Sequence, residues 1–179
     1  MHAAVVRAVD IARDAGALAA IDTSFTTAHV FKANVHDGIP CLAPVEVTPP
    51  IRKRFPFRLD NDPRQECFVI ADGRGAIVGL SAVAYEPWNR RLVLWHYYVD
   101  LACRRRGFGR LLMDRAIARG RDVGAMTVWA ETSNVNYPGI LAYRRMGFEI
   151  CGFDLTHYLG TPAEGEFAVF LSRAIDGGR

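Results

Sequence analysis

The most informative segment of this sequence is Arg104-Arg105-Arg106-Gly107-Phe108-Gly109-Arg110. It follows a strand-like run, 92–100, and opens a segment in which apolar residues recur at helical spacing. A turn from a strand into a helix points several backbone N–H groups outward, and the helix N-terminus adds a partial positive charge. Glycines at 107 and 109 allow a ligand to approach the backbone closely. The segment therefore predicts a cradle for an anion such as a pyrophosphate.

Spacing and position exclude two other phosphate-binding motifs. A P-loop needs four residues between its glycines, followed by Lys and then Ser or Thr, whereas one residue separates Gly107 from Gly109. A dinucleotide-binding fingerprint follows the first strand of its βαβ unit, but several strand-like runs precede residue 104. Taken alone, the pattern R-x-x-G-x-G also fits a basic surface loop, so its interpretation depends on the rest of the chain.

Strand and helix patterns alternate on either side of this turn. Upstream, the turn at 72–75 joins two strand-like runs, 67–71 and 76–85, into a predicted hairpin. Downstream, we expect helices over 107–123 and 138–146 and strands over 126–130, 148–153 and 167–171. A strand meander followed by β-α-β-α-β predicts a mixed-sheet α/β (α+β) domain with helices on both faces.

The first third of the chain is less regular. Residues 5–22 predict a strand followed by a helix. Residues 23–64 favour loops and irregular edge strands, because every run is interrupted by a proline: Pro40, Pro44, Pro49, Pro50, Pro56 and Pro63. Such a segment often carries substrate selection. At 179 residues, we expect one domain, 1–179.

Composition narrows the class of protein. Half of the residues are hydrophobic and 23% are charged, as in an ordinary globular protein. The apolar runs are strand-sized and the N-terminus does not resemble a secretory signal, so we expect no membrane span and a cytoplasmic location. The four cysteines form no C-x-x-C pair, which argues against a metal site. A net charge of +3 is modest for a nucleic-acid-binding protein.

A second motif supports the interpretation of the turn as a cofactor cradle. It reads Asn134-Val135-Asn136-Tyr137-Pro138-Gly139-Ile140-Leu141-Ala142-Tyr143-Arg144-Arg145-Met146-Gly147-Phe148. With R-x-x-G-x-G before it, this segment resembles the GNAT superfamily of acyl-CoA-dependent N-acyltransferases. The residues 131–132 and 152–158 resemble the streptothricin acetyltransferases within it. The resemblance implies a GNAT-like, mostly antiparallel sheet of about seven strands, with acetyl-CoA as the acyl donor and no metal.

The resemblance also implies where the cofactor binds. The N–H groups of Arg106, Gly107, Phe108, Gly109 and Arg110 would hold the CoA pyrophosphate, and the backbone of Tyr98, Val99 and Leu101 would pair with the pantetheine arm. A side chain from Arg104, Arg105 or Arg106 would reach the phosphates.

Two side chains of the second motif have both a functional and a structural interpretation. Asn136 would lie near the pantetheine, although it also suits a helix N-cap. The resemblance implies that Tyr143, whose ordinary pKa is about 10 against about 8.5 for a thiol, protonates the departing CoA thiolate; alternatively, it is a core aromatic.

The residue that deprotonates the acceptor amine is left open. In streptothricin acetyltransferases we expect a Glu nine residues before the motif Arg, but Trp95 stands there. Substitutes are Glu86, His96 and Asp100. Free imidazole has a suitable pKa near 6.5, but strand alternation points His96 away from Trp95 unless a bulge intervenes.

Three further features concern the acceptor and the chemistry. Trp95 and Tyr97 share one side of the strand by period two and would line the acyl and acceptor pocket. Asp154, Glu164 and Glu166 would contact a polycationic acceptor or form a solvated acidic loop. Cys103 offers a covalent route through an acetyl-enzyme, as an alternative to direct transfer.

The expected function is acetyl-CoA-dependent N-acetylation of a primary amine on a small molecule, with a streptothricin-like antibiotic as the candidate. The alternatives are acetylation of a protein N-terminus or lysine, and a non-catalytic acyl-CoA-binding module. The active form would be a monomer or a homodimer, and the length of the acyl donor stays open.

Overall fold

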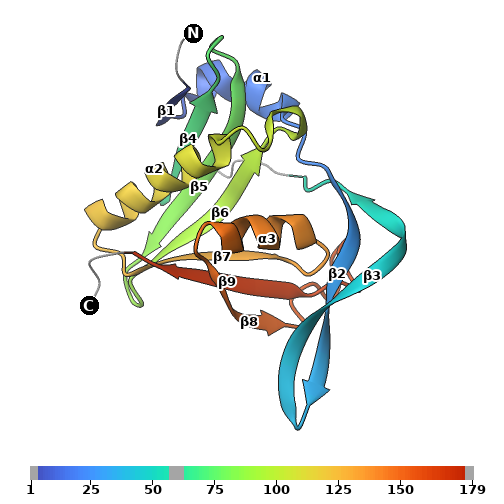
Figure 1. The fold of residues 1–179 in the computed structure, drawn as a ribbon. Helices are drawn as coiled ribbons and strands as arrows, with labels where there is room; N and C mark the ends of the chain where they lie inside the picture. Colours follow the sequence, from blue (N-terminus) through green and yellow to red (C-terminus); the bar gives the residue numbers. More distant parts are fainter. Residues whose placement is uncertain (1–3, 57–62, 176–179) are drawn as a thin grey trace. The chain divides into compact units, whose positions relative to one another are not determined.

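The computed structural model describes residues 4–56 and 63–175 (Figure 1). These residues form nine strands and three α-helices with one short 3-10 helix. In chain order they are β1 Val5–Ala8, α1 Ile11–Ala20, β2 Phe25–His36, β3 Ile39–Lys53, β4 Gln65–Ala71, β5 Ile77–Glu86, β6 Arg91–Val99, η1 Leu101–Cys103, α2 Phe108–Asp122, β7 Thr127–Ser133, α3 Tyr137–Arg145, β8 Glu149–Asp154 and β9 Ala168–Ala174.

Seven strands hydrogen-bond in the order β1-β4-β5-β6-β7-β9-β8, and β2 and β3 form a separate two-stranded sheet. The β1–β4, β4–β5, β5–β6 and β8–β9 pairs are antiparallel, whereas β6 and β7 run parallel. The predicted mixed, mostly antiparallel sheet of about seven strands is confirmed.

The described residues divide into two compact units. The first unit comprises 4–23, 54–56, 63–130 and 173–175, and the second comprises 24–53 and 131–172. Strand β7 contributes its first four residues to the first unit and its last three to the second. A single domain over 1–179 stays a prediction.

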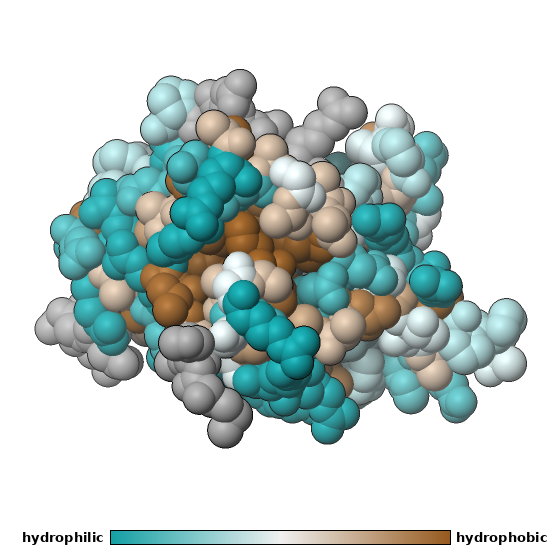
Figure 2. All heavy atoms as spheres, turned by 90° about the horizontal axis from the view of Figure 1, so that it is seen from above, coloured by the Kyte–Doolittle hydropathy of each residue, from teal (hydrophilic) through white to brown (hydrophobic). Residues whose placement is uncertain are grey.

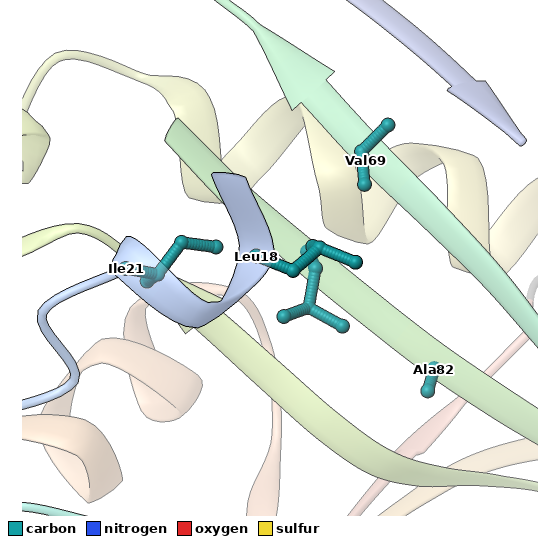
Figure 3. Close-up of a cluster of buried hydrophobic side chains, with 5 residues drawn as sticks. Leu18, Ile21, Val69 and Ala82 are labelled. Carbon is teal, nitrogen blue, oxygen red and sulfur yellow. The ribbon is translucent and has the colours of Figure 1, made fainter. Parts of the chain in front are cut away.

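In the first unit, helices cover both faces of the sheet. Leu18 and Ile21, at the end of α1, pack against one face, where they meet a cluster formed by Val69, Leu80 and Ala82 (Figure 3). Helix α2 covers the other face, where Arg115 lies 4.4 Å above the ring of Phe68. Phe68 and Val69 point in opposite directions because side chains alternate along β4. The predicted arrangement of helices on both faces is confirmed in this unit.

Helix α1 is tied to β1 by a charged pair. Asp14 is 2% exposed, and Arg7 donates to both of its carboxylate oxygens at 2.6 and 2.7 Å. The backbone N–H of Asp10 donates to the same carboxylate at 2.9 Å. Bidentate arginine–carboxylate pairs of this kind fix the relative orientation of the two side chains and also strengthen the interaction between them.

In the second unit, β2 and β3 form a long hairpin where the sequence predicted loops and irregular edge strands (Figure 1). Proline lacks an N–H, but in a two-stranded sheet each strand has one edge that needs no partner. Four of the prolines, Pro40, Pro44, Pro49 and Pro50, therefore lie within β3. The proline content was a poor guide here because it disfavours central strands and not edge strands.

Asn134 anchors this hairpin within the second unit. Its side chain is buried, donates to the carbonyl of Phe31 at 2.9 Å and accepts from the backbone N–H of Phe167 at 3.0 Å. Its own N–H donates to the carbonyl of Phe167. One asparagine thus connects β2 to the segment that enters β9.

Polar side chains cover most of the face drawn in Figure 2, and apolar side chains gather near its centre. Among the described residues, no helix is long and apolar enough to cross a membrane. Within the same residues no cluster of His, Cys, Asp or Glu side chains has the arrangement of a metal site, and the four cysteines are free thiols.

Candidate active site

The predicted cradle forms the N-terminal end of α2 in the first unit. Gly107 is the N-cap and has a φ of 87°, a left-handed conformation that glycine adopts without strain. No described side chain caps this end, and the first turn carries no acidic residue. The first N–H groups of an α-helix have no acceptor within the helix, so they and the helix dipole face outward. The turn is therefore built to receive an anion.

Gly109 has a different role from the one expected. A Cβ at this position would lie 2.9 Å from the Tyr97 hydroxyl oxygen, and the Tyr97 hydroxyl donates to the carbonyl of Gly109 at 2.6 Å. The close approach that requires glycine is therefore made by Tyr97, from β6. Burial raises the pKa of Tyr97 well above the ordinary tyrosine value. Tyr97 therefore supports the start of α2, and its predicted place in the wall of the acceptor pocket stays a prediction.

Among the three arginines of the motif, Arg104 is engaged within the protein. Its Nε donates to the carbonyl of Val99 at 3.0 Å, and the side chain also reaches the carbonyl of Asp22. Burial lowers its pKa, against the nearby charges of Asp22 and Asp100. Arg106 is exposed, with its guanidinium 5.4 Å from the centre of the Phe108 ring. Arg104 is thus a structural residue, whereas Arg105 and Arg106 remain exposed on the turn.

A β-bulge lies in the middle of β6. Ala82 pairs with His96 and Val83 pairs with Leu94, so Trp95 is the extra residue. The bulge interrupts the period-two alternation on which the sequence analysis relied. The ring of His96 lies 6.0 Å from that of Tyr98, which packs against the α1 cluster, while Tyr97 faces α2. With the bulge at Trp95, simple alternation does not decide whether Trp95 shares a side with Tyr97; Trp95 itself is half exposed.

The end of β6 offers fewer free backbone groups than expected. The N–H of Asp100 donates to the carbonyl of Val78 on β5. Since antiparallel pairs alternate, the backbone of Tyr98 also faces β5, and the backbone of Val99 faces away from it. The N–H of Leu101 donates to the carbonyl of Asp22. Of the three predicted pantetheine contacts, which stay a prediction, Val99 is the one with its backbone directed away from β5.

Two of the candidate bases, Glu86 and Asp100, have partners within the protein. Glu86 pairs with Arg91 at the far end of the β5–β6 hairpin, and its carboxylate lies 3.6 Å from Arg64. Seven residues separate it from Gly79, which pairs with Val99, so it lies roughly 23 Å from the cradle end of β6. Asp100 accepts from the N–H groups of Asp22 and Ala102, both at 2.9 Å.

In the second unit, Asn136 has the structural role that the sequence analysis gave as the alternative. It is the N-cap of α3: its Oδ1 accepts from the N–H of Gly139 at 3.1 Å, and its Nδ2 donates to the hydroxyl of Thr132 at 2.9 Å. A Cβ on Gly139 would come within 2.6 Å of the amide carbon of Asn136, so glycine is needed at that position.

Tyr143 lies on α3, two turns after the cap, and is 9% exposed. Its ring centroid lies 5.3 Å from that of Phe148, at an interplanar angle of 59°. Its carbonyl accepts from the N–H groups of Met146 and Phe148, which closes the helix.

One group of polar residues in the second unit was not recognised as functional from the sequence. Glu131, on β7, accepts a hydrogen bond from the hydroxyl of Tyr158 and lies 3.9 Å from Nε2 of His157. The only signal in the sequence was the resemblance of 131–132 and 152–158 to one family. No local pattern joins residues that are 26 positions or more apart, so their contact could not be predicted.

The acidic loop has local partners. Asp154 accepts from both the N–H and the hydroxyl of Thr156, which hold its pKa below the ordinary value. Glu166 accepts from Lys53 and from the hydroxyl of Ser133. The carboxylate of Glu166 is thus neutralised within the second unit and is not available to a cationic acceptor in the way the sequence suggested.

This geometry is that of an acyl-CoA-dependent acetyltransferase, and the comparisons with known proteins agree. The Acetyltransferase (GNAT) family model matches residues 35–148, and the chain belongs to this family. It is therefore an enzyme, an N-acetyltransferase with acetyl-CoA as cosubstrate, and the non-catalytic alternative is set aside.

Particular relatives are more informative still. The chain is 39% identical to the streptothricin acetyltransferase of Streptomyces lavendulae over 168 residues, which cover 89% of each protein. It is 40% identical to a nourseothricin acetyltransferase of known crystal structure, with a TM-score of 0.88 over 97% of this chain and 99% of the other. A Bacillus anthracis protein solved with acetyl coenzyme A is 21% identical, with a TM-score of 0.82 over 96% and 99% of the two chains, and shows the shared fold alone.

Proposed function

We propose that this enzyme acetylates a primary amine of a streptothricin-like antibiotic and thereby confers resistance to it. One observation carries the proposal: similarity to a streptothricin acetyltransferase extends over 89% of both chains at 39% identity. Whole-length similarity at this level includes the β2–β3 hairpin and the loop at 155–166, which lie outside the cofactor motifs. The proposal includes a cytoplasmic location and a monomer or homodimer as the active form.

The cofactor end of the proposed site uses the first unit. The uncapped N–H groups at 107–110 would bind the pyrophosphate, and the exposed guanidinium groups of Arg105 and Arg106 would add charge-assisted bonds. The backbone of Val99 would pair with the pantetheine amide, since it faces away from β5. Arg104 would act indirectly, by holding the Val99 carbonyl.

The chemical step would be direct attack in a ternary complex. The acceptor nitrogen attacks the thioester carbonyl carbon, the C–S bond breaks, and the CoA thiolate leaves. Tyr143 would protonate this thiolate, because an ordinary phenol is protonated at neutral pH and its proton stabilises the leaving group as charge develops on the sulfur. Over the whole reaction the ammonium nitrogen loses two protons, of which one ends on the CoA sulfur and one is released to solvent.

The experiment that tests the proposal measures CoA release with a thiol-reactive dye. The acceptor panel contains streptothricin, aminoglycosides, polyamines, amino acids and short peptides. We expect turnover of streptothricin and a kcat about 10²-fold lower in Tyr143→Phe. Tyr85→Phe, a tyrosine on β5, is the matched control and should retain the wild-type rate. Turnover restricted to peptides would contradict the substrate, and an unchanged kcat in Tyr143→Phe would contradict the acid role.

A further inference from the structure

The proposed acetyl transfer needs a group that takes a proton from the acceptor ammonium, and three of the four expected positions do not supply it. Trp95 stands where the resemblance calls for Glu. Glu86 is remote from the cradle, and Asp100 holds two backbone N–H groups. We propose that Glu131 and His157 together bind the acceptor ammonium and accept its proton. This inference rests on the proposed N-acetyl transfer to an amine.

The carboxylate of Glu131 is held in one orientation. Tyr158 donates its hydroxyl to Oε1, and Oε2 is the oxygen that faces His157. The imidazole of His157 is itself fixed by edge-on contacts with two aromatic rings, at 4.9 Å from Tyr158 and 6.2 Å from Phe170. Both groups are partly accessible, with 28% of the Glu131 side chain and 42% of the His157 side chain exposed. They are therefore ordered and still open to a ligand.

The distance between the two groups fits an inserted ammonium. Oε2 of Glu131 and Nε2 of His157 lie 3.9 Å apart, which is too far for a direct hydrogen bond. One nitrogen atom can lie about 2.9 Å from both atoms at this separation and donate a hydrogen bond to each. A carboxylate alone attracts any cation, but a carboxylate next to an imidazole acceptor selects a cation with at least two N–H groups to donate.

The proton balance assigns different tasks to the two side chains. Glu131 attracts the ammonium and stays ionised, while the N–H bond breaks toward Nε2 of His157, which becomes imidazolium. The nitrogen keeps the electron pair and attacks the thioester carbon. His157 then passes its proton to water, since much of its side chain is exposed. A carboxylate is a poor base for an ammonium because their ordinary pKa values differ by about 6 units, whereas imidazole is suited to the task near neutral pH.

The other titratable group near His157 also bears on its charge. Asp154, at the end of β8, lies close enough that the two side chains interact electrostatically. Asp154 and Glu131 thus place two carboxylates near the imidazole, and the Tyr158 hydroxyl is bonded to Glu131. The third neighbouring element, β9, contributes the apolar Phe170.

The test uses Glu131→Gln and His157→Gln in the full-length enzyme, with whichever amine the wild type acetylates best. Glu149→Gln, an exposed carboxylate on β8, is the matched control. We expect Glu131→Gln to lower kcat/KM for the amine about 10²-fold, with acetyl-CoA affinity by calorimetry unchanged. His157→Gln should lower kcat/KM for the amine by a similar factor, again with acetyl-CoA affinity unchanged. Thermal unfolding of each variant checks that the fold is kept, and Glu131→Asp should retain more activity than Glu131→Gln.

The outcomes separate this inference from the proposed substrate. If the wild type acetylates polyamines and not streptothricin, the substrate proposal fails, while the variants still test the role of Glu131 on the polyamine. If the wild type acetylates streptothricin and Glu131→Gln stays within about 3-fold of Glu149→Gln, the inference is overturned and the substrate stands. A kcat/KM of His157→Gln within about 3-fold of that of Glu149→Gln also overturns it.

Discussion

Replacing Gly109 with alanine is expected to destabilise the start of α2 through Tyr97. The new Cβ would lie 2.9 Å from the Tyr97 hydroxyl oxygen, which would have to move from its 2.6 Å bond to the Gly109 carbonyl. Losing such a bond costs about 0.5–1.5 kcal/mol, rising to about 3 kcal/mol when buried partners are left unsatisfied. Alanine returns up to about 1 kcal/mol through its helix propensity. We therefore expect a net loss of about 1–2 kcal/mol, or a Tm lower by about 2–8 °C.

The assay is chemical denaturation of Gly109→Ala, Tyr97→Phe and the double variant. Removing the hydroxyl removes the clash, and the next nearest atom, Cζ of Tyr97, lies 3.8 Å from the Cβ, an ordinary contact. Gly109→Ala should therefore be neutral or stabilising when Phe is at position 97. Gly107→Ala is the control: its Cβ meets no described atom within 4 Å, but its φ of 87° costs about 1–2 kcal/mol in either background. Equal destabilisation by Gly109→Ala in both backgrounds would refute the reasoning.

Two further predictions concern other fixed points of the fold. Gly139→Ala should disrupt the α3 cap and lower the free energy of unfolding by about 1–2 kcal/mol, because its Cβ would overlap the Asn136 side chain. In an Asn136→Ala background the same change should leave the free energy of unfolding unaltered. Thermal unfolding of the single and double variants checks this. The hydrogen bonds from Arg7 lower the pKa of Asp14 from 3.8 to about 2, so this pair stabilises the fold fully above about pH 4, and its contribution is lost as pH falls through about 2. Arg7→Gln should therefore flatten the rise of Tm between pH 2 and 4, and a slope equal to that of the wild type would contradict the assignment.

The parts of the fold that could be predicted from the sequence are those set by local chemistry. The turn at 72–75 joins β4 and β5, and Gly107 begins α2, because glycine and turn residues act over a few positions. The β2–β3 hairpin was missed because its prolines lie in a strand that needs only one partner.

The candidate site was predicted less completely, for a physical reason. The anion cradle is a local feature, and its sequence indicates it directly. The bulge at Trp95 has no sequence signal of its own, and it decides which way His96 and Tyr97 point. The contact of Glu131 with His157 and Tyr158 depends on how distant strands and loops come together, which periodicity does not describe.

The role of Tyr97 and Arg104 follows from the same geometry. Tyr97 bonds the carbonyl of Gly109, and Arg104 bonds the carbonyl of Val99, so the start of α2 is held to the end of β6 at two points. Those two elements carry the groups proposed to bind pyrophosphate and pantetheine. A binding surface that is already ordered loses less conformational freedom when a ligand binds. In this proposal, Tyr97 and Arg104 would serve the cofactor by fixing the spacing of the backbone groups proposed to bind it, and Arg104 would do so without contacting the phosphates itself.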